Sequence, residues 1–313
     1  MRVLLALDGS PASDAARRLV ASLPWPEGTM LHVVGAVEPV VDSFAGVSGY
    51  PGMSVDVEPP FESSLSAILD EACTSLEAPG RIVRRSVHVG RPGSVIVDEA
   101  AAMRAELIIV GSRGLGPMKS MVLGSVSAEV VDHAPCPVLV VRRPQVSTVL
   151  FATDGSASAR GALTFLASLH YLADRPIEVI SVGARASSIP TLVMGTGPGR
   201  MPSENPVLAD REHTEAKAAI AVEALRASGH AARWSVAAGD PAHEIVEAAR
   251  AFGSDLIVVG SRGNTGLDRL LLGSVARNVL LHTDCSVLIV REPIRVKAEE
   301  PLKARIALAA GAV

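Results

Sequence analysis

The sequence has few of the residues that stabilise small secreted proteins or stack on nucleic-acid bases. Only 3 of its 313 residues are cysteine (Cys73, Cys136 and Cys285), and they show neither CxxC nor cysteine–histidine zinc spacing. Aromatic residues make up 3% and the formal net charge is −4. A general nucleic-acid binder needs a basic face and stacking aromatics. These shortages argue against a disulfide framework, a structural zinc and a nucleic-acid partner.

Long apolar runs are also missing, although hydrophobic residues make up 48% of the chain. Charged residues, glycine or proline interrupt every run before the roughly 18–20 residues that cross a bilayer. The opening stretch MRVLLALDGS has an apolar run similar to that of a signal peptide, but Asp8 ends it and no small-residue cleavage site follows. We therefore expect a first strand, a cytoplasmic location and no membrane partner.

Two segments of the chain share one glycine frame: Gly, two residues, Gly, nine residues, Gly-Ser. They are VGSRGLGPMKSMVLGS (110–125) and VGSRGNTGLDRLLLGS (259–274). When 105–144 is aligned with 254–293, nearly half of the positions are identical. The chain is therefore an internal duplication. We predict a first domain at 1–144, a second at 145–294 and a tail at 295–313.

The start of each half adds to the match, because VLLALDGS (3–10) resembles VLFATDGS (149–156). Matching 32–34 with 181–183 places three additional residues of the second half around its first helix. Both halves also contain a Gly/Pro/Ser-rich segment, 38–60 and 183–206, of the kind that forms lids or disordered connections. We expect these two segments to be mobile flaps.

Within each half, short apolar runs alternate with segments of helical periodicity. Strands are predicted at 3–7, 31–37, 83–89, 107–111 and 138–141, and helices at 13–23, 61–76, 92–103 and 125–133. The second half repeats the helices at 159–169, 216–228, 241–252 and 274–282. The fold class is therefore α/β, with two tandem doubly wound domains, each a five-stranded parallel sheet covered on both faces.

The glycine frames follow the fourth strand of each half, at the sheet edge where ligands of such folds bind. Without a Cβ, Gly111 and Gly114 could adopt positive φ and let a phosphate approach the backbone amides. Gly124-Ser125 then opens a helix whose first N–H groups favour an anion. Gly260, Gly263, Gly273 and Ser274 repeat this arrangement. A single GxxG could be only a tight turn, but its repetition favours a phosphate site.

Asp8 and Asp154 end the first strand of each half at the same sheet edge. Their carboxylates could accept from a ribose hydroxyl or an adenine amine, or could cap the following helix. The neighbouring glycine loop favours the ligand role. Arg113 and Arg262 lie inside the loops, where a guanidinium could reach a phosphate or remain solvated.

Together, the early Asp-Gly-Ser, the glycine frames and the last strands HAPCPVLVVR and HTDCSVLIVR resemble the universal stress protein family in its tandem form. The resemblance extends to about Arg291. It implies an adenine-nucleotide alpha-hydrolase-like, Rossmann-like fold that binds ATP, with Mg²⁺ held through the phosphates. It also implies that two domains pair through their last strands. Here the two halves could pair within one chain, which leaves another face for a homodimer.

The family's binding positions can be transferred to both halves. In the first, Asp8 and Val33 would hold adenine and ribose, and ribose and phosphates would be lined by Val110, Gly111, Gly114, Gly124, Ser125 and Val126. The matching residues of the second half are Asp154, Val182, Val259, Gly260, Gly263, Gly273, Ser274 and Val275. Because Lys119 aligns with Asp268, the two sites are expected to differ in affinity.

Motifs for rapid catalysis are missing: no Gly-Lys pair of a P-loop and no GxSxG elbow occur in the sequence. His133 and His282 end the last helix of each half, where interaction with free carbonyls is the expected role. We expect an ATP-binding regulatory or sensor protein with an unidentified protein partner, no dedicated catalytic residue and at most slow hydrolysis. The alternatives are an adenylate-handling enzyme on a similar fold and an interaction protein without nucleotide.

Overall fold

The computed structural model describes residues 1–38, 60–114, 123–184, 206–263 and 272–291. The first half contains strands β1 (Arg2–Ala6), β2 (Thr29–Val37), β3 (Arg81–Val89), β4 (Leu107–Gly111) and β5 (Val138–Val141), and helices α1 (Pro11–Ser22), α2 (Pro60–Leu76), α3 (Pro92–Ala102) and α4 (Ser125–His133). These bounds confirm the strands and helices predicted there.

The second half repeats the same order. Its strands are β6 (Val149–Ala152), β7 (Ile177–Gly183), β8 (Ala232–Ala238), β9 (Leu256–Gly260) and β10 (Ser286–Val290). Its helices are α5 (Ala157–Ser168), the short 3-10 helix η1 (His170–Leu172), α6 (Pro206–Ala227), α7 (Pro241–Phe252) and α8 (Ser274–His282).

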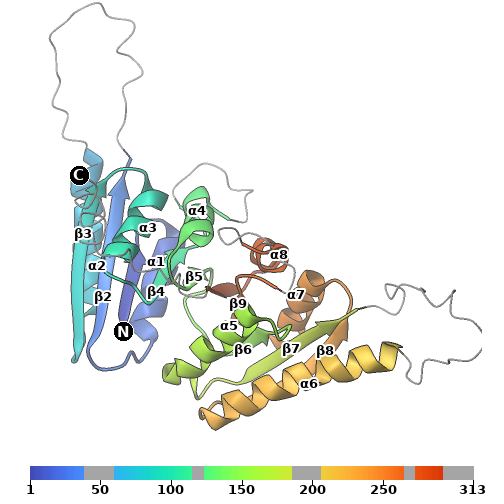
Figure 1. Cartoon of the computed structure of the whole chain (residues 1–313). Helices are drawn as coiled ribbons and strands as arrows, with labels where there is room; N and C mark the ends of the chain where they lie inside the picture. Colours follow the sequence, from blue (N-terminus) through green and yellow to red (C-terminus); the bar gives the residue numbers. More distant parts are fainter. Residues whose placement is uncertain (39–59, 115–122, 185–205, 264–271, 292–313) are drawn as a thin grey trace, which may run out of the picture.

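All ten strands form one sheet in the order β3-β2-β1-β4-β5-β10-β9-β6-β7-β8 (Figure 1). Within each half the pairs are parallel, whereas β5 and β10 pair antiparallel, with Leu139 opposite Leu288. This confirms the predicted α/β tandem fold. It also confirms that the two halves pair through their last strands within one chain.

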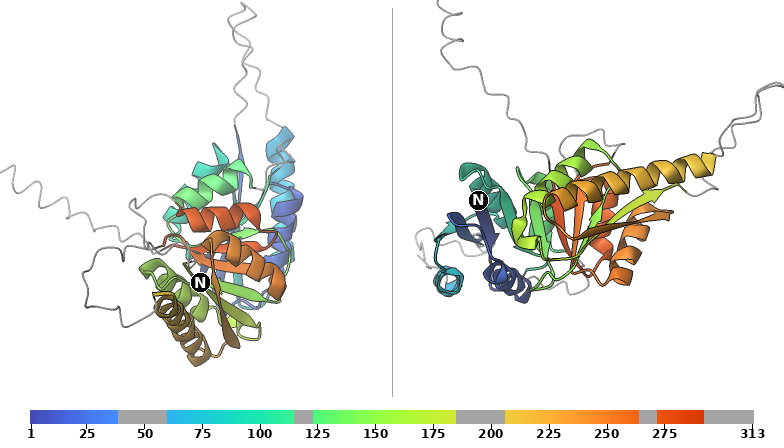
Figure 2. Two further views of the ribbon diagram at one scale, coloured as in Figure 1. Left: turned by 90° about the vertical axis from the view of Figure 1, so that its right-hand side faces the viewer. Right: turned by 90° about the horizontal axis from the view of Figure 1, so that it is seen from below.

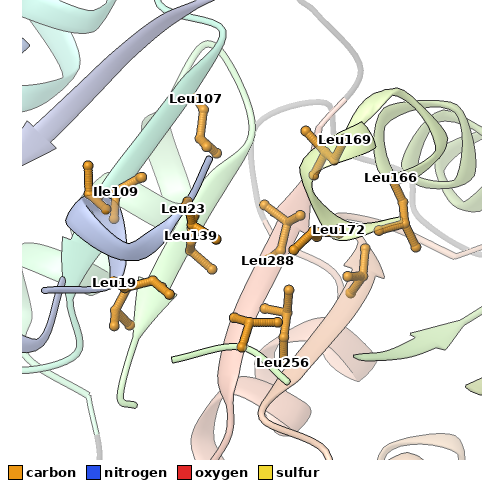
Figure 3. Packing of buried hydrophobic residues seen from close by; sticks show 14 of the residues in the cluster. Leu19, Leu23, Leu107, Ile109, Leu139, Leu166, Leu169, Leu172, Leu256 and Leu288 are labelled. Carbon is orange, nitrogen blue, oxygen red and sulfur yellow. The ribbon is translucent and has the colours of Figure 1, made fainter. Parts of the chain in front are cut away.

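Helices cover both faces of the sheet (Figure 2). One apolar core lies beneath α1, α2, α5 and α6, and the other beneath α3, α4, α7 and α8. The first core continues across the junction, where leucines from both halves gather, among them Leu139 and Leu288 (Figure 3). The strands β1 (RVLLA) and β4 (LIIVG) are almost entirely apolar, because helices bury them on both faces of the sheet.

Side chains reinforce the junction of the halves. Arg142 donates to the carbonyl of Leu280 at 2.7 Å, and its counterpart Arg291 donates to the carbonyl of Asp132 at 2.8 Å. Each last strand thus supplies a cation to the C-terminal end of the other half's last helix, where free carbonyls favour positive charge. The rings of Trp25 and Tyr171 also meet, with centroids 5.0 Å apart.

The strand register corrects the position of the three additional residues. Leu7 donates its N–H to the carbonyl of Val34, and Thr153 donates to that of Ile180, so the first helix and the second strand have equal spacing in both halves. The extra residues therefore lie after β7 and before the buried part of α6. The prediction failed because the match of 32–34 with 181–183 was too short to fix the register. Val182 corresponds to Ala36, not to Val33.

Most of the two predicted flaps, residues 115–122 and 264–271 of the glycine frames, and the tail lie outside the described residues. Within the described part, no helix combines the length and the apolar composition needed to cross a membrane.

Candidate functional site

The turn after the first strand has the same construction in both halves. Asp8 Oδ1 accepts the N–H of Ser10 at 2.9 Å, and Asp154 Oδ1 accepts that of Ser156 at 2.9 Å. Ser10 and Ser156, rather than the aspartates, cap α1 and α5. The helix-cap alternative for the two aspartates is therefore wrong, since each uses one oxygen to hold a turn. The other oxygen of each carboxylate faces the glycine loop.

The second glycine of each frame leaves room for that oxygen. A Cβ on Gly114 would lie 2.7 Å from Asp8 Oδ2, and one on Gly263 would lie 3.0 Å from Asp154 Oδ2. A side chain at either position would enter the space in front of the carboxylate. These two glycines therefore keep an open cradle between the carboxylate and the glycine loop.

The first glycine of each frame serves packing instead. A Cβ on Gly111 would lie 2.6 Å from the carbonyl carbon of Ala12, and one on Gly260 would lie 2.8 Å from that of Ser158. Both clashes are with backbone in the first turn of α1 or α5. Positive φ, which we predicted for Gly111 and Gly114, is absent from both; Gly9 and Gly155 of the aspartate turns adopt it. Close approach of chain segments is the reason for Gly111 and Gly260.

The third glycine closes the loop and begins a helix. Gly124 donates its N–H to the carbonyl of Ser112, and Gly273 to that of Ser261, both at 2.8 Å. Gly124 and Gly273 are the N-caps of α4 and α8, so neither N-cap residue supplies a side chain to the first turn of its helix. The first N–H groups of both helices are therefore suited to an anion.

In the second half these parts surround a cavity of about 330 Å³. All the residues predicted for this half line it: Asp154, Val182, Val259, Gly260, Arg262, Gly263, Gly273, Ser274 and Val275. The strand and helix ends add apolar wall from Ile180, Pro241 and Ile245. Small-molecule sites of about 300–1,000 Å³ combine apolar walls with a few polar groups, and this cavity has that character.

The equivalent cavity of the first half encloses only about 100 Å³. It is lined by the predicted residues Asp8, Val110, Gly111, Arg113, Gly114 and Val126, whereas Gly124 and Ser125 are not part of its lining. Its size is below the usual range for a small-molecule site. The two cavities therefore differ in capacity although their turns and glycine frames match.

Val33 is misplaced in the prediction. It packs in the core beneath α1 and α2, on the opposite face of the sheet from the cavity, whereas Val34 and Ala36 line the cavity. Side chains alternate between the faces of a strand, so an error of one residue reverses the face. The alternation along β2 would have identified Val34 and Ala36 if the cavity face had been known.

The loop arginines differ between the halves. Arg113 is exposed and its carbonyl accepts from the Ser10 hydroxyl at 3.2 Å. Arg262 is half-buried, and its N–H donates to Ser158 Oγ at 3.2 Å. Both arginines line their cavities, where a guanidinium can pair with an anionic ligand.

His133 and His282 follow their prediction. The Nδ1 atom of His133 lies 2.9 Å from the Glu129 carbonyl, and that of His282 lies 2.8 Å from the Asn278 carbonyl. Both residues close the last turn of a helix. Cys136 and Cys285 are buried, and burial raises the pKa of Cys136 to about 12.

A polar cluster beneath the first cavity was not predicted. The carboxylate of Glu99 lies 3.5 Å from both His32 Nδ1 and His88 Nε2, and the Ser86 hydroxyl lies 2.9 Å from Nε2 of each histidine. Burial lowers the pKa of His32, while the Glu99 carboxylate opposes that shift. The duplication hides this cluster, because the second half has no histidine at the matching positions.

The fold defines a tandem α/β protein in which each half carries a glycine-framed cavity at the carboxyl ends of its parallel strands. The model of the universal stress protein family matches the chain twice, at residues 1–142 and 146–291. The chain belongs to the universal stress protein family.

Relatives resemble one half or the whole chain. A universal stress protein of Thermus aquaticus is 38% identical over 146 residues, which cover 45% of this chain and 97% of the relative. A universal stress protein of Mycolicibacterium smegmatis is 28% identical over 310 residues, covering 92% of this chain and 96% of the relative. A crystal structure of a universal stress protein from Archaeoglobus fulgidus shares the fold, with a TM-score of 0.64, 20% identity, and coverage of 93% and 98%.

Proposed function

We propose that the protein binds ATP as a regulatory or sensor module, with the cavity of the second half as its stronger site. The observation that carries this proposal is the cradle between Asp154 and Gly263, beside the start of α8, whose N-cap residue is a glycine. A carboxylate oxygen suits a ribose hydroxyl, and free N–H groups suit a phosphate. The apolar walls of Ile180 and Val182 suit the adenine ring.

A magnesium ion would be held mainly through the phosphates of ATP. Among the described residues, no group of three or more His, Cys, Asp or Glu side chains is placed to hold a metal. Mg²⁺ commonly binds one or two carboxylates together with substrate phosphates and water. Asp154 is the carboxylate that would contact such an ion, because its Oδ2 atom faces the glycine loop.

The groups around the cavity support the proposal that ATP is hydrolysed slowly at most. Among the described residues, the lining supplies a carboxylate, hydroxyls and a guanidinium, but no histidine or lysine. An efficient ATPase needs a residue that positions the attacking water and a cation on the transferred phosphoryl group. We propose that binding, rather than turnover, carries the regulatory signal.

Equilibrium dialysis of nucleotide-stripped protein against labelled ATP, GTP and adenosine, with magnesium, tests the proposal. We expect ATP to bind in preference to GTP and phosphate release to be slow. Rapid release would favour the adenylate-handling enzyme. No retention of ATP would leave the interaction protein as the better description.

We also propose a cytoplasmic location, a homodimer and an unidentified protein partner. With β5 and β10 already paired inside the chain, a homodimer would use another face. Light scattering at several protein concentrations checks the dimer, and a constant monomer mass would contradict it.

A further inference from the structure

The last turn of α4 and the first turn of α8 meet at the junction of the halves (Figure 1). Arg277 donates to the Asp132 carboxylate at 2.7 Å, and its own N–H closes the first turn of α8 by donating to the Gly273 carbonyl at 3.0 Å. The three residues before Arg277 line the second cavity. The ion pair therefore connects the wall of the second cavity to the first half.

A second contact reaches the same aspartate. Arg291, which directly follows β10 and is buried, donates to the Asp132 carbonyl at 2.8 Å. Burial lowers the pKa of the Arg291 guanidinium, the Asp132 carboxylate opposes that shift, and the Arg262 guanidinium adds to it. Arg291 thus lies within electrostatic reach of both Asp132 and Arg262, and Arg262 lines the second cavity. Asp132 is therefore linked to that cavity by two routes, through α8 and through Arg291.

The helix that carries Asp132 forms part of the first cavity. It has only nine residues, and Val126 and Ser127 of its first turn line that cavity. Each N–H in an α-helix bonds to the carbonyl four residues before it, so a restraint on the last turn of so short a helix acts on the whole of it. Asp132 thus lies between the two cavities.

The duplication does not repeat this ion pair. The positions that match Asp132 and Arg277 hold Leu281 and Ala128, whose apolar side chains cannot form the mirrored bridge. Arg142 does mirror Arg291, since it donates to the Leu280 carbonyl at 2.7 Å. The first turn of α8 is therefore tied by charge to the other half, whereas the first turn of α4 has no charged residue at the matching position.

We propose that Asp132 couples the two cavities, so that a nucleotide at the start of α8 restricts the motion of α4 and of the first-cavity wall that α4 forms. The inference rests on the proposed function, because its ligand is the nucleotide of the second cavity. A phosphate on the first N–H groups of α8 holds that turn, and Arg277 then holds Asp132 in place. A ligand that orders a helix lowers the ordering cost for a second ligand, so occupancy of the second cavity favours binding at the first.

Hydrogen exchange of the full chain, with and without ATP and magnesium, tests this coupling. Gly114→Val serves as the background, so that ATP acts only through the second cavity. ATP should slow amide exchange at residues 274–278 of α8 and, about fivefold, at residues 129–133 of α4. Adding Arg277→Ala or Asp132→Asn should preserve the slowing in α8 and abolish it in α4.

Glu129→Gln is the matched control, because it also removes a carboxylate from α4. Glu129 contacts Arg91 and Ser94 at the start of α3, away from the junction, so this variant should keep the slowing in both helices. Slowing in α8 without slowing in α4 of the Gly114→Val protein would overturn the coupling. Slowing in α4 that survives both Arg277→Ala and Asp132→Asn would overturn the role of Asp132. If exchange slows in neither helix, the proposed function fails and the inference fails with it.

Discussion

The second-half cavity encloses about 330 Å³ and the first-half cavity about 100 Å³, although the same aspartate turn and glycine frame build both. Their linings differ at neighbouring positions: Leu7 replaces Thr153, and Ser127 replaces Ala276. The Ser127 hydroxyl donates to the Gly111 carbonyl at 2.7 Å. The duplicated backbone frame thus keeps the same cradle in both halves, while the side chains around the two cavities differ.

The halves also differ in the residues that lie beneath the two cavities. His32 and Glu99 face each other beneath the first cavity, whereas their counterparts are Glu178 and Ala248. Glu178 instead pairs with Arg233 on the edge strand. The first half therefore carries a histidine–carboxylate cluster where the second has an ion pair between buried Glu178 and exposed Arg233. Changes to each half in turn can show which of these differences matter.

The largest expected effect comes from the packing glycines. Gly111→Ala and Gly260→Ala should each lower the free energy of unfolding by about 2–3 kcal/mol, because the new Cβ meets helix backbone that cannot move aside cheaply. Denaturant titration measures the change. Gly263→Ala is the control, since its Cβ meets only a side-chain oxygen. Equal stability of all three variants would contradict the packing role.

The second-largest expected effect is on ATP affinity, and it distinguishes Asp154 from Asp8. Asp154→Asn should weaken ATP binding about tenfold, because the amide replaces a charged acceptor at the cradle. Asp8→Asn should change ATP binding much less, since the first cavity is small. Isothermal calorimetry and thermal melting, run together, distinguish the roles. A lower melting temperature with unchanged ATP affinity would show that Asp154 serves only the turn.

A pH effect is expected for the first half alone. Around His32 stand Glu99 from α3 and His88 and Arg84 from β3, and burial, the largest cause, lowers the His32 pKa from its usual 6.5. The unfolded state therefore binds more protons in the acid range. The contribution of neutral His32 to the free energy of unfolding is complete above about pH 6.5. It is lost as the pH falls toward the lower pKa of the folded state.

His32→Gln removes this titration while keeping a hydrogen-bonding side chain beside Ser86. Between about pH 7.5 and pH 5.5 the variant should lose less stability than the wild type. Thermal melting across that range gives the comparison. Parallel losses in both proteins would show that His32 does not sense protons in the folded state.

The smallest effect concerns the junction. Arg277 of α8 donates to the Asp132 carboxylate of α4 at 2.7 Å, and the pair is partly exposed. Arg277→Ala should lower the free energy of unfolding by roughly 0.5–1 kcal/mol. Arg250→Ala breaks an exposed pair within α7 and should cost less. If both substitutions had the same effect, the bridge would add nothing specific to the junction.

Most of the architecture could be predicted, because strand and helix periods were strong and the repeat supplied all five strands and all four α-helices of a half twice. The site was harder to predict from the sequence. Asp8 and Gly114 were identifiable by motif, but the face of Val33 depended on a register that the sequence left ambiguous. The roles of Gly111 and Gly260 depended on contacts with a distant helix turn, and the cluster of His32, Ser86, His88 and Glu99 had no counterpart in the repeat to draw attention to it.

The central claim is that the second half carries the stronger ATP site. Its most direct test is calorimetric titration of nucleotide-stripped protein with ATP and magnesium, comparing Gly263→Val with Gly114→Val. Valine at either position would fill the space before the carboxylate. The account predicts that Gly263→Val abolishes the tight binding and that Gly114→Val retains it. Loss of tight binding in Gly114→Val with retention in Gly263→Val would contradict it.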